Sequence, residues 1–154
     1  MSYTQSPPLS ENEIDLFLNE QKIATICSLN NDGTIHATAV WFLYKNGSIV
    51  MSTPAATRKV RNIIRNNSVT VFIDDREKVR GVLIFGKAKL DHDYSFRDAT
   101  SLYEKYMSIQ QAAKFAREMT RAAKGGAVLI TVKPERIVSF DSTKDTVLKL
   151  NVRE

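Results

Sequence analysis

Residues 23–53, IATICSLNNDGTIHATAVWFLYKNGSIVMST, hold three β-rich runs separated by two tight-turn signals. The runs are 23–29, 34–44 and 48–53, and the turns are Asn31-Asp32-Gly33 and Lys45-Asn46-Gly47. Asp-Gly and Asn-Gly between β-branched and aromatic residues are typical of hairpin turns. Connections this short cannot carry the crossover that parallel strands need. The stretch therefore predicts a three-stranded antiparallel meander.

The rest of the chain adds strands and helices around this meander. Ser10-Glu11-Asn12-Glu13 is a capping box that predicts a helix over about residues 11–20. Further strands are predicted at 68–73, 81–90 with a bend or bulge at Gly86, 127–132 and 136–140, and helices at about 93–107 and 110–123. Because strands and helices do not alternate regularly, a doubly wound parallel sheet is excluded. We expect a mainly β protein, a six- to seven-stranded antiparallel split β-barrel with helices outside.

The chain of 154 residues has the length of one domain. We expect a loose N-terminal arm at 1–10, a barrel domain over 11–141 and a polar, peripheral tail at 142–154. The single Cys27 allows no intrachain disulfide, and the sequence shows no signal peptide, so we expect a cytoplasmic protein. No apolar stretch approaches the roughly 20 residues that cross a bilayer, so no membrane partner is expected.

Residues 52–65, STPAATRKVRNIIR, join a strand end to a basic helix. Thr53 can cap this helix, and Pro54 suits its first position. The free N–H groups and the dipole at a helix start attract anions. The hydroxyl and basic side chains that would complete a phosphate cradle are those of Ser52, Thr53, Arg58, Lys59 and Arg61. The alternative is a solvated basic helix whose apolar stripe is Val60, Ile63 and Ile64.

The net charge of +5 is compatible with nucleic-acid binding. However, the cations are spread over several segments and mixed with acids, and we find no zinc-ligand spacing, RNA-stacking motif or helix-turn-helix signature. A basic surface attracts a phosphorylated or polyanionic small molecule equally well. We therefore expect a small-molecule partner and no nucleic acid.

Several segments, in this order, resemble the pyridoxamine 5′-phosphate oxidase-like superfamily, the FMN-binding split barrels. They are ATICSLNNDGTIH at 24–36, AVWFL at 39–43, STPAATRKVRN at 52–62, VTVFIDD at 69–75, and the strand 81–90 with its Gly-Lys-Ala portion. The resemblance spans about residues 23–141. It implies a homodimer with a cofactor site at the interface and hydride transfer to or from a small organic substrate.

The same resemblance implies which residues bind the cofactor. The phosphate would lie among Ser52, Thr53, Arg58, Lys59 and Arg61, and the flavin ring along Ala39, Val40, Trp41 and Phe42. Trp41 either stacks on the ring or fills the barrel. The sequence lacks the longer C-terminal substrate-phosphate segment of true pyridoxamine-phosphate oxidases, so that activity is not expected. The implied cofactor is FMN or, alternatively, coenzyme F-420.

No side chain is predicted to be catalytic, because a flavin or deazaflavin carries its own redox chemistry. No metal site is predicted either. His36 and His92 either face the cofactor or substrate or, as we favour, are surface or hydrogen-bonded residues. Asp74-Asp75 is interpreted as a turn and Cys27 as a buried apolar filler. Tyr103, Tyr106 and Met107 either line the ligand cavity or pack the helices. The expected function is an FMN- or deazaflavin-dependent oxidoreductase, and the alternative is a flavin, deazaflavin or haem binding or carrier protein without turnover.

Overall fold

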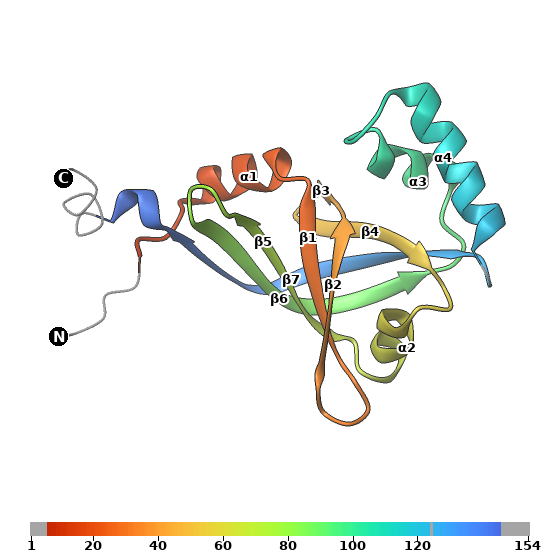
Figure 1. Ribbon diagram of the computed structural model, residues 1–154, viewed down its shortest axis with the longest axis horizontal. Helices are drawn as coiled ribbons and strands as arrows, with labels where there is room; N and C mark the ends of the chain where they lie inside the picture. The colour runs from red at the N-terminus through yellow and green to blue at the C-terminus, as the bar shows by residue number, and fades with distance from the viewer. Residues whose placement is uncertain (1–5, 124, 146–154) are drawn as a thin grey trace.

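The computed structural model describes residues 6–123 and 125–145, and in these ranges the chain is mainly β. Seven strands form one antiparallel sheet in the order β2-β1-β5-β6-β7-β4-β3, which curls into a half-barrel with the helices outside (Figure 1). The strands are β1 Ile23–Leu29, β2 Ile35–Trp41, β3 Leu43–Lys45, β4 Ser48–Pro54, β5 Ser68–Asp75, β6 Arg80–Asp91 and β7 Ala127–Asp141. The helices are α1 Glu11–Glu20, α2 Arg58–Arg65, α3 Phe96–Tyr103, α4 Ile109–Ala122 and the short 3₁₀-helix η1 Ser142–Lys144. The predicted fold class is confirmed.

The two edges of the sheet are consecutive in the chain, because only Phe42 separates β2 from β3. The prediction of one strand over 34–44 is therefore wrong. At Phe42 the chain leaves one edge and joins the other, so the curled sheet has a seam at this residue. The Phe42 side chain is fully buried in the barrel core.

The barrel core consists of side chains that alternate along the strands. On β1, β4 and β5 every second residue is buried, as expected for strands with one face toward a core. The largest core side chains come from α1 as well as from the sheet, and they include Phe17, Leu18, Ile26, Met51 and Ile84. By contrast, none of the residues of β2 is buried.

Strand β7 is continuous from Ala127 to Asp141, whereas two strands around Pro134 were predicted. Its pairing with β6 shifts register by one residue, since Phe85 pairs with Arg136 and Gly86 with Pro134. Glu135 has no partner on β6 and is the bulged residue. The strand therefore continues past Pro134, which has no N–H to donate. The predicted bulge at Gly86 is confirmed.

Between β6 and β7 the chain makes a long excursion, residues 92–126, that contains α3 and α4 (Figure 1). Ser108 and Gln111 form a capping box at the start of α4. After α4, Gly125 and Gly126 have φ angles of 77° and 79°, which glycine adopts without strain. Within the described ranges, no helix combines the length and apolarity that a membrane span requires.

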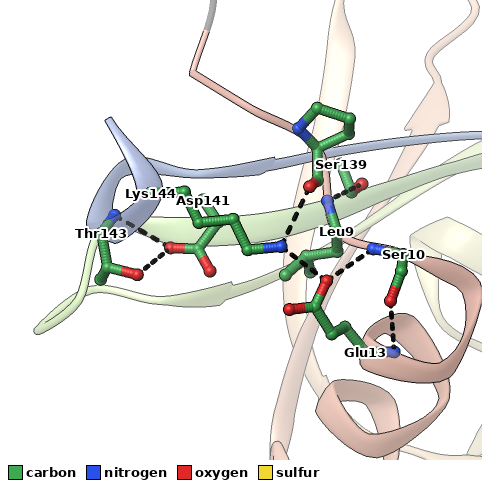
Figure 2. A network of polar contacts seen from close by, with 8 residues as sticks. Leu9, Ser10, Glu13, Ser139, Asp141, Thr143 and Lys144 are labelled. Carbon is green, nitrogen blue, oxygen red and sulfur yellow. Dashed lines mark hydrogen bonds and ion pairs between the residues drawn. The ribbon is translucent and has the colours of Figure 1, made fainter. Parts of the chain in front are cut away.

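The start and the end of the described chain pack together (Figure 2). The N–H of Leu9 donates to Ser139 Oγ at 3.0 Å, and Leu9 is buried. Lys144 Nζ lies 2.6 Å from Glu13 Oε2, and this hydrogen bond, with the one from the Ser10 N–H, lowers the pKa of Glu13 to about 2. Within the expected arm Leu9 is thus packed, whereas Pro7, Pro8 and Ser10 are exposed. The expected arm and tail otherwise fall on residues 1–5 and 146–154, which lie outside the described residues.

Candidate functional site

A cavity of about 220 Å³ lies at the seam, between β2, β4 and the helices α2, α3 and α4. It brings together six of the nine residues predicted to bind a cofactor: Ala39, Val40, Trp41, Ser52, Thr53 and Lys59. The remaining lining residues come from the excursion between β6 and β7 and are Leu102, Tyr103, Phe115 and Met119. The cavity therefore has a polar end, formed by β4 and α2, and an aromatic end, formed by β2 and the helices.

The helix beside the polar end begins later than predicted. Pro54 is the last residue of β4 and pairs with Ala127, and the N–H of Ala55 still donates to the Gly126 carbonyl at 2.9 Å. Helix α2 begins at Arg58, with Thr57 at its N-cap. The predicted cap at Thr53 is therefore wrong, because pairing with β7 keeps residues 53 and 54 in the strand.

Lys59 is the central cation of the polar end. Its side chain is buried, with the residue 7% exposed, and its ammonium donates to Thr53 Oγ1 at 3.2 Å. Among the described residues no carboxylate forms an ion pair with it, and burial lowers the pKa of Lys59. Thr57 Oγ1 is buried without a hydrogen-bond partner among the described residues, and it does not cap α2. A buried cation without a counter-ion and an unpartnered hydroxyl at a helix N-terminus together suit an anionic ligand.

Three of the predicted cofactor residues do not line the cavity. Arg58 and Arg61 are exposed, and Arg61 Nη1 donates to the Ala56 carbonyl at 3.4 Å. The charge of Arg58 acts on Asp32 instead, where it contributes to the lowered pKa of that carboxyl group, although hydrogen bonds from Thr34 are the main cause. Phe42 is the third, because its side chain fills the barrel core.

The rest of α2 fixes the helix to the sheet. Asn62 Nδ2 donates to Ser28 Oγ at 3.1 Å and to Asn30 Oδ1 at 3.0 Å, at the end of β1. Of the predicted apolar stripe, Val60 and Ile63 are buried and Ile64 is exposed. Lys59 and Asn62 are buried as well, so a fully solvated basic face is excluded.

Trp41 forms the aromatic end with rings from the excursion. Its ring is stacked on Tyr106, with centroids 4.6 Å apart, and lies 6.3 Å from Tyr103 and 5.7 Å from Phe115. The residue is 37% exposed and is not part of the barrel core. The alternative in which Trp41 fills the barrel is therefore wrong. Its indole borders the cavity, where a planar ligand could lie against it.

Tyr106 closes the seam next to this aromatic end. Its hydroxyl accepts from the Phe42 N–H at 2.7 Å and lies within donating distance of the Phe42 and Lys22 carbonyl oxygens, at 2.7 and 2.8 Å. Burial raises the pKa of Tyr106 to about 12. The Tyr106 hydroxyl thus provides a hydrogen-bond partner for both the N–H and the carbonyl of Phe42, where the chain passes from β2 to β3. Sequence reasoning placed Tyr106 among lining or packing residues and missed this role, for which the sequence carries no local signal.

Tyr103 connects the two ends of the cavity. It is buried, it packs edge-on against Phe115 at 4.8 Å, and its hydroxyl interacts with the Ser52 side chain. Burial raises the pKa of Tyr103, and the Ser52 contact acts in the opposite direction. Met107, from the same predicted cluster, packs against the α3–α4 core instead.

The other candidate residues lie away from the cavity. His36 Nε2 is 2.9 Å from Thr38 Oγ1, and Asp74 and Asp75 pair with Arg76 and Arg80 at the turn between β5 and β6. Cys27 is half-buried, and burial raises the pKa of its thiol. Among the described residues no group of three or more His, Cys, Asp or Glu is placed to hold a metal ion.

Comparison with known proteins gives one family and a set of solved structures. A family model described as pyridoxamine 5′-phosphate oxidase matches residues 10–140. A conserved hypothetical protein from Mycobacterium tuberculosis is 23% identical with a TM-score of 0.78, over 100% of this chain and 94% of that one. A structure described as an F420 reductase is 19% identical with a TM-score of 0.64, over 80% and 94% of the two chains. A FAD-binding protein from Mesorhizobium loti is 14% identical with a TM-score of 0.61, over 86% and 93%.

These structural likenesses are all below 25% identity and show a shared fold. Among curated proteins, none is significantly similar to this chain. The family match covers all seven strands but for the last residue of β7, together with every element that lines the cavity.

Proposed function

The chain belongs to the pyridoxamine 5′-phosphate oxidase family, and from this premise we propose that it is an oxidoreductase that binds FMN, or alternatively coenzyme F-420, in the cavity at the seam. Proteins of the same fold are described as an F420 reductase and as a FAD-binding protein, which supports a ligand of this chemical class. The proposed substrate is a small organic molecule that exchanges a hydride with the cofactor.

The observation that carries the proposal is the buried ammonium of Lys59, which donates to Thr53 and has no ion pair among the described residues. A cofactor phosphate would supply the missing negative charge, and the unpartnered Thr57 hydroxyl would give a further donor at the start of α2. The ring would extend from there toward Trp41 and Tyr103. The donor set and the aromatic end of the cavity thus fit the two chemically different parts of one flavin phosphate.

The size of the cavity supports a shared site. About 220 Å³ lies below the roughly 300 Å³ at which cavities for molecules of cofactor size begin, so such a ligand would extend beyond the cavity of one chain. Strand β2, which forms one wall, has no buried residue and begins at the exposed Ile35. We propose that a second copy of the chain covers this strand and the remaining part of the ligand in a homodimer.

When bound, the flavin or deazaflavin supplies the hydride chemistry itself. Of the residues of this chain, Lys59 and Thr53 would bind the phosphate, Trp41 would orient the ring, and Tyr103 and Phe115 would exclude water from it. No side chain of the cavity is assigned as a general acid or base.

A side-by-side titration of the purified protein with FMN and with coenzyme F-420, followed by ring fluorescence, tests the proposal. We expect saturable binding of one of them, and oxidation of the reduced cofactor with a panel of small unsaturated acceptors. Binding without turnover would instead identify a carrier protein. Binding of neither cofactor would overturn the proposal, and haem would then be the next ligand to titrate.

A further inference from the structure

The excursion between β6 and β7, residues 92–126, is not needed to complete the sheet. The two strands pair directly with one another up to Asp91 and Leu129, so a short turn could join them. Instead the chain inserts α3 and α4, which pack on each other through an apolar cluster separate from the barrel core. The members of this cluster are Ala99, Leu102, Tyr103, Ala112 and Ala116. Leu43 of β3 and Val50 of β4 pack against this cluster, so the two helices lie against the sheet on the face opposite to the barrel core.

This helical module, residues 92–126, is fixed to the barrel at the turn between its two helices. Tyr106 holds the Phe42 backbone at the seam, as described above. The neighbouring Lys105 donates to the Leu18 carbonyl at 3.1 Å, and its ammonium lies 3.8 Å from the centroid of the Phe42 ring. Because α1 and the seam both hold this turn, the position of α4 relative to β2 is set by specific contacts.

The face of α4 that borders the cavity carries Phe115 and Met119. Phe115 packs against Trp41 and Tyr103, with ring centroids 5.7 and 4.8 Å away. Phe115 therefore lies at the aromatic end, and Met119 follows it four residues later on the same face of α4. In this arrangement the ring of a bound ligand would meet α4 as well as Trp41 of β2.

We propose that the helical module of residues 92–126 is the selectivity wall of the site, and that Phe115 and Met119 set the largest ring system that the cavity accepts. This inference rests on the proposed function, because it takes the aromatic end to be the ring end. Bulky apolar side chains that are fixed in position discriminate between ligands by size. One additional methylene group on a ligand in such a pocket changes the discrimination by about 10- to 200-fold.

The test compares FMN with an analogue in which one ring methyl group is replaced by an ethyl group. Dissociation constants for both are measured with the unaltered protein, Phe115→Ala, Met119→Ala and the control Ile109→Ala. Ile109 lies on α4 as well but is 67% exposed and does not line the cavity. We expect the unaltered protein and the control to prefer FMN by about tenfold or more, and Phe115→Ala or Met119→Ala to lose most of that preference.

The possible results separate the two claims. If the unaltered protein binds FMN but the preference is the same in Phe115→Ala and Met119→Ala, the selectivity wall is wrong and the proposed function stands. If the unaltered protein binds neither flavin, this inference falls, and the proposed function falls with it if coenzyme F-420 does not bind either. Phe115→Leu, a smaller truncation, replaces Phe115→Ala if that variant does not fold by circular dichroism, and it should show a partial loss of preference.

Discussion

Replacing Lys59 with methionine tests the polar end of the cavity. The substitution keeps an unbranched apolar side chain in a buried position but removes the ammonium that donates to Thr53. If this ammonium binds the cofactor phosphate, the variant should lose affinity for FMN and keep its affinity for riboflavin, which has the same ring without the phosphate. Comparison of the two ligands therefore isolates the phosphate contact from any change in the ring site.

The size of the effect follows from the contact that is lost. A hydrogen bond to a charged group contributes about 1.5–3 kcal/mol, which corresponds to roughly a 10- to 150-fold rise in the dissociation constant for FMN. The ligand-free variant should be as stable as the unaltered protein or more stable, because the ammonium is buried without an ion pair among the described residues. Binding and stability should thus change independently.

The pH dependence of FMN binding follows from the same residue. Burial lowers the pKa of Lys59 below its ordinary value, and a phosphate that pairs with the ammonium would raise it again. Binding should therefore take up a proton as the pH approaches the lowered pKa. The affinity for FMN should fall as the pH rises through that range, whereas the affinity for riboflavin should show no contribution from Lys59.

Ring fluorescence titrations at several pH values and thermal unfolding without ligand provide the measurements. Arg61→Met is the matched control, because Arg61 is on the same helix but is exposed and does not line the cavity. It should change FMN affinity much less than Lys59→Met, because exposed charges are screened by solvent. Equal losses for FMN and riboflavin in Lys59→Met, or no loss for either, would refute the assignment of the phosphate to Lys59.

Three further variants test the fold around the site. Glu13→Gln removes the carboxylate that pairs with Lys144. Because the pKa of Glu13 is lowered from 4.5 to about 2, this carboxylate stabilises the fold fully above pH 4.5 and loses its effect toward pH 2. The melting temperature of the variant should therefore fall less between pH 4.5 and pH 2 than that of the unaltered protein. Gly86→Ala places a methyl group against the Lys133 carbonyl and should lower the free energy of unfolding in urea by about 1–3 kcal/mol. Tyr106→Phe leaves a backbone N–H at the seam without its partner and should cost about 1–3 kcal/mol in the same assay, with a change in tryptophan emission.

Each of these expectations has a result that contradicts it. Tyr44→Phe is the control for Tyr106, because its hydroxyl donates to the exposed Asp15, and it should change unfolding much less. Equal effects of the two tyrosine variants would mean that the seam does not depend on the Tyr106 hydroxyl. An unchanged urea midpoint in Gly86→Ala would show that the bulge relaxes without cost, and identical acid profiles for Glu13→Gln and the unaltered protein would remove the Lys144 pair from the stability of the fold.

Local chemistry predicted most of the strands and helices. The Asp-Gly and Asn-Gly turns place β1, β2 and β4 close to their observed bounds, and the Ser10 capping box defines α1. The break at Phe42 could not be predicted, because the hydroxyl that satisfies its backbone belongs to Tyr106, 64 residues away. Likewise, a proline such as Pro134 by itself predicts the end of a strand. It lies within β7 because it pairs with Gly86 of β6 next to the bulge at Glu135.

Some residues of the candidate site could likewise be predicted from the sequence, and others could not. Ser52, Thr53 and Lys59 could be chosen from the sequence because a strand end, hydroxyls and a basic helix stand together there. The start of α2 was misplaced, since the pairing of Pro54 with Ala127 depends on a strand from the far end of the chain. The lining residues of α4, Phe115 and Met119, have the spacing of any amphipathic helix, and only the fold shows that they border a cavity.

The most direct test of the account is a crystal structure of the protein with FMN bound. We expect a phosphate oxygen within hydrogen-bond distance of Lys59 Nζ and Thr53 Oγ1, and the flavin ring beside Trp41 in the cavity at the seam. A structure in which the phosphate lies away from Lys59, or in which FMN occupies another part of the surface, would contradict the central claim.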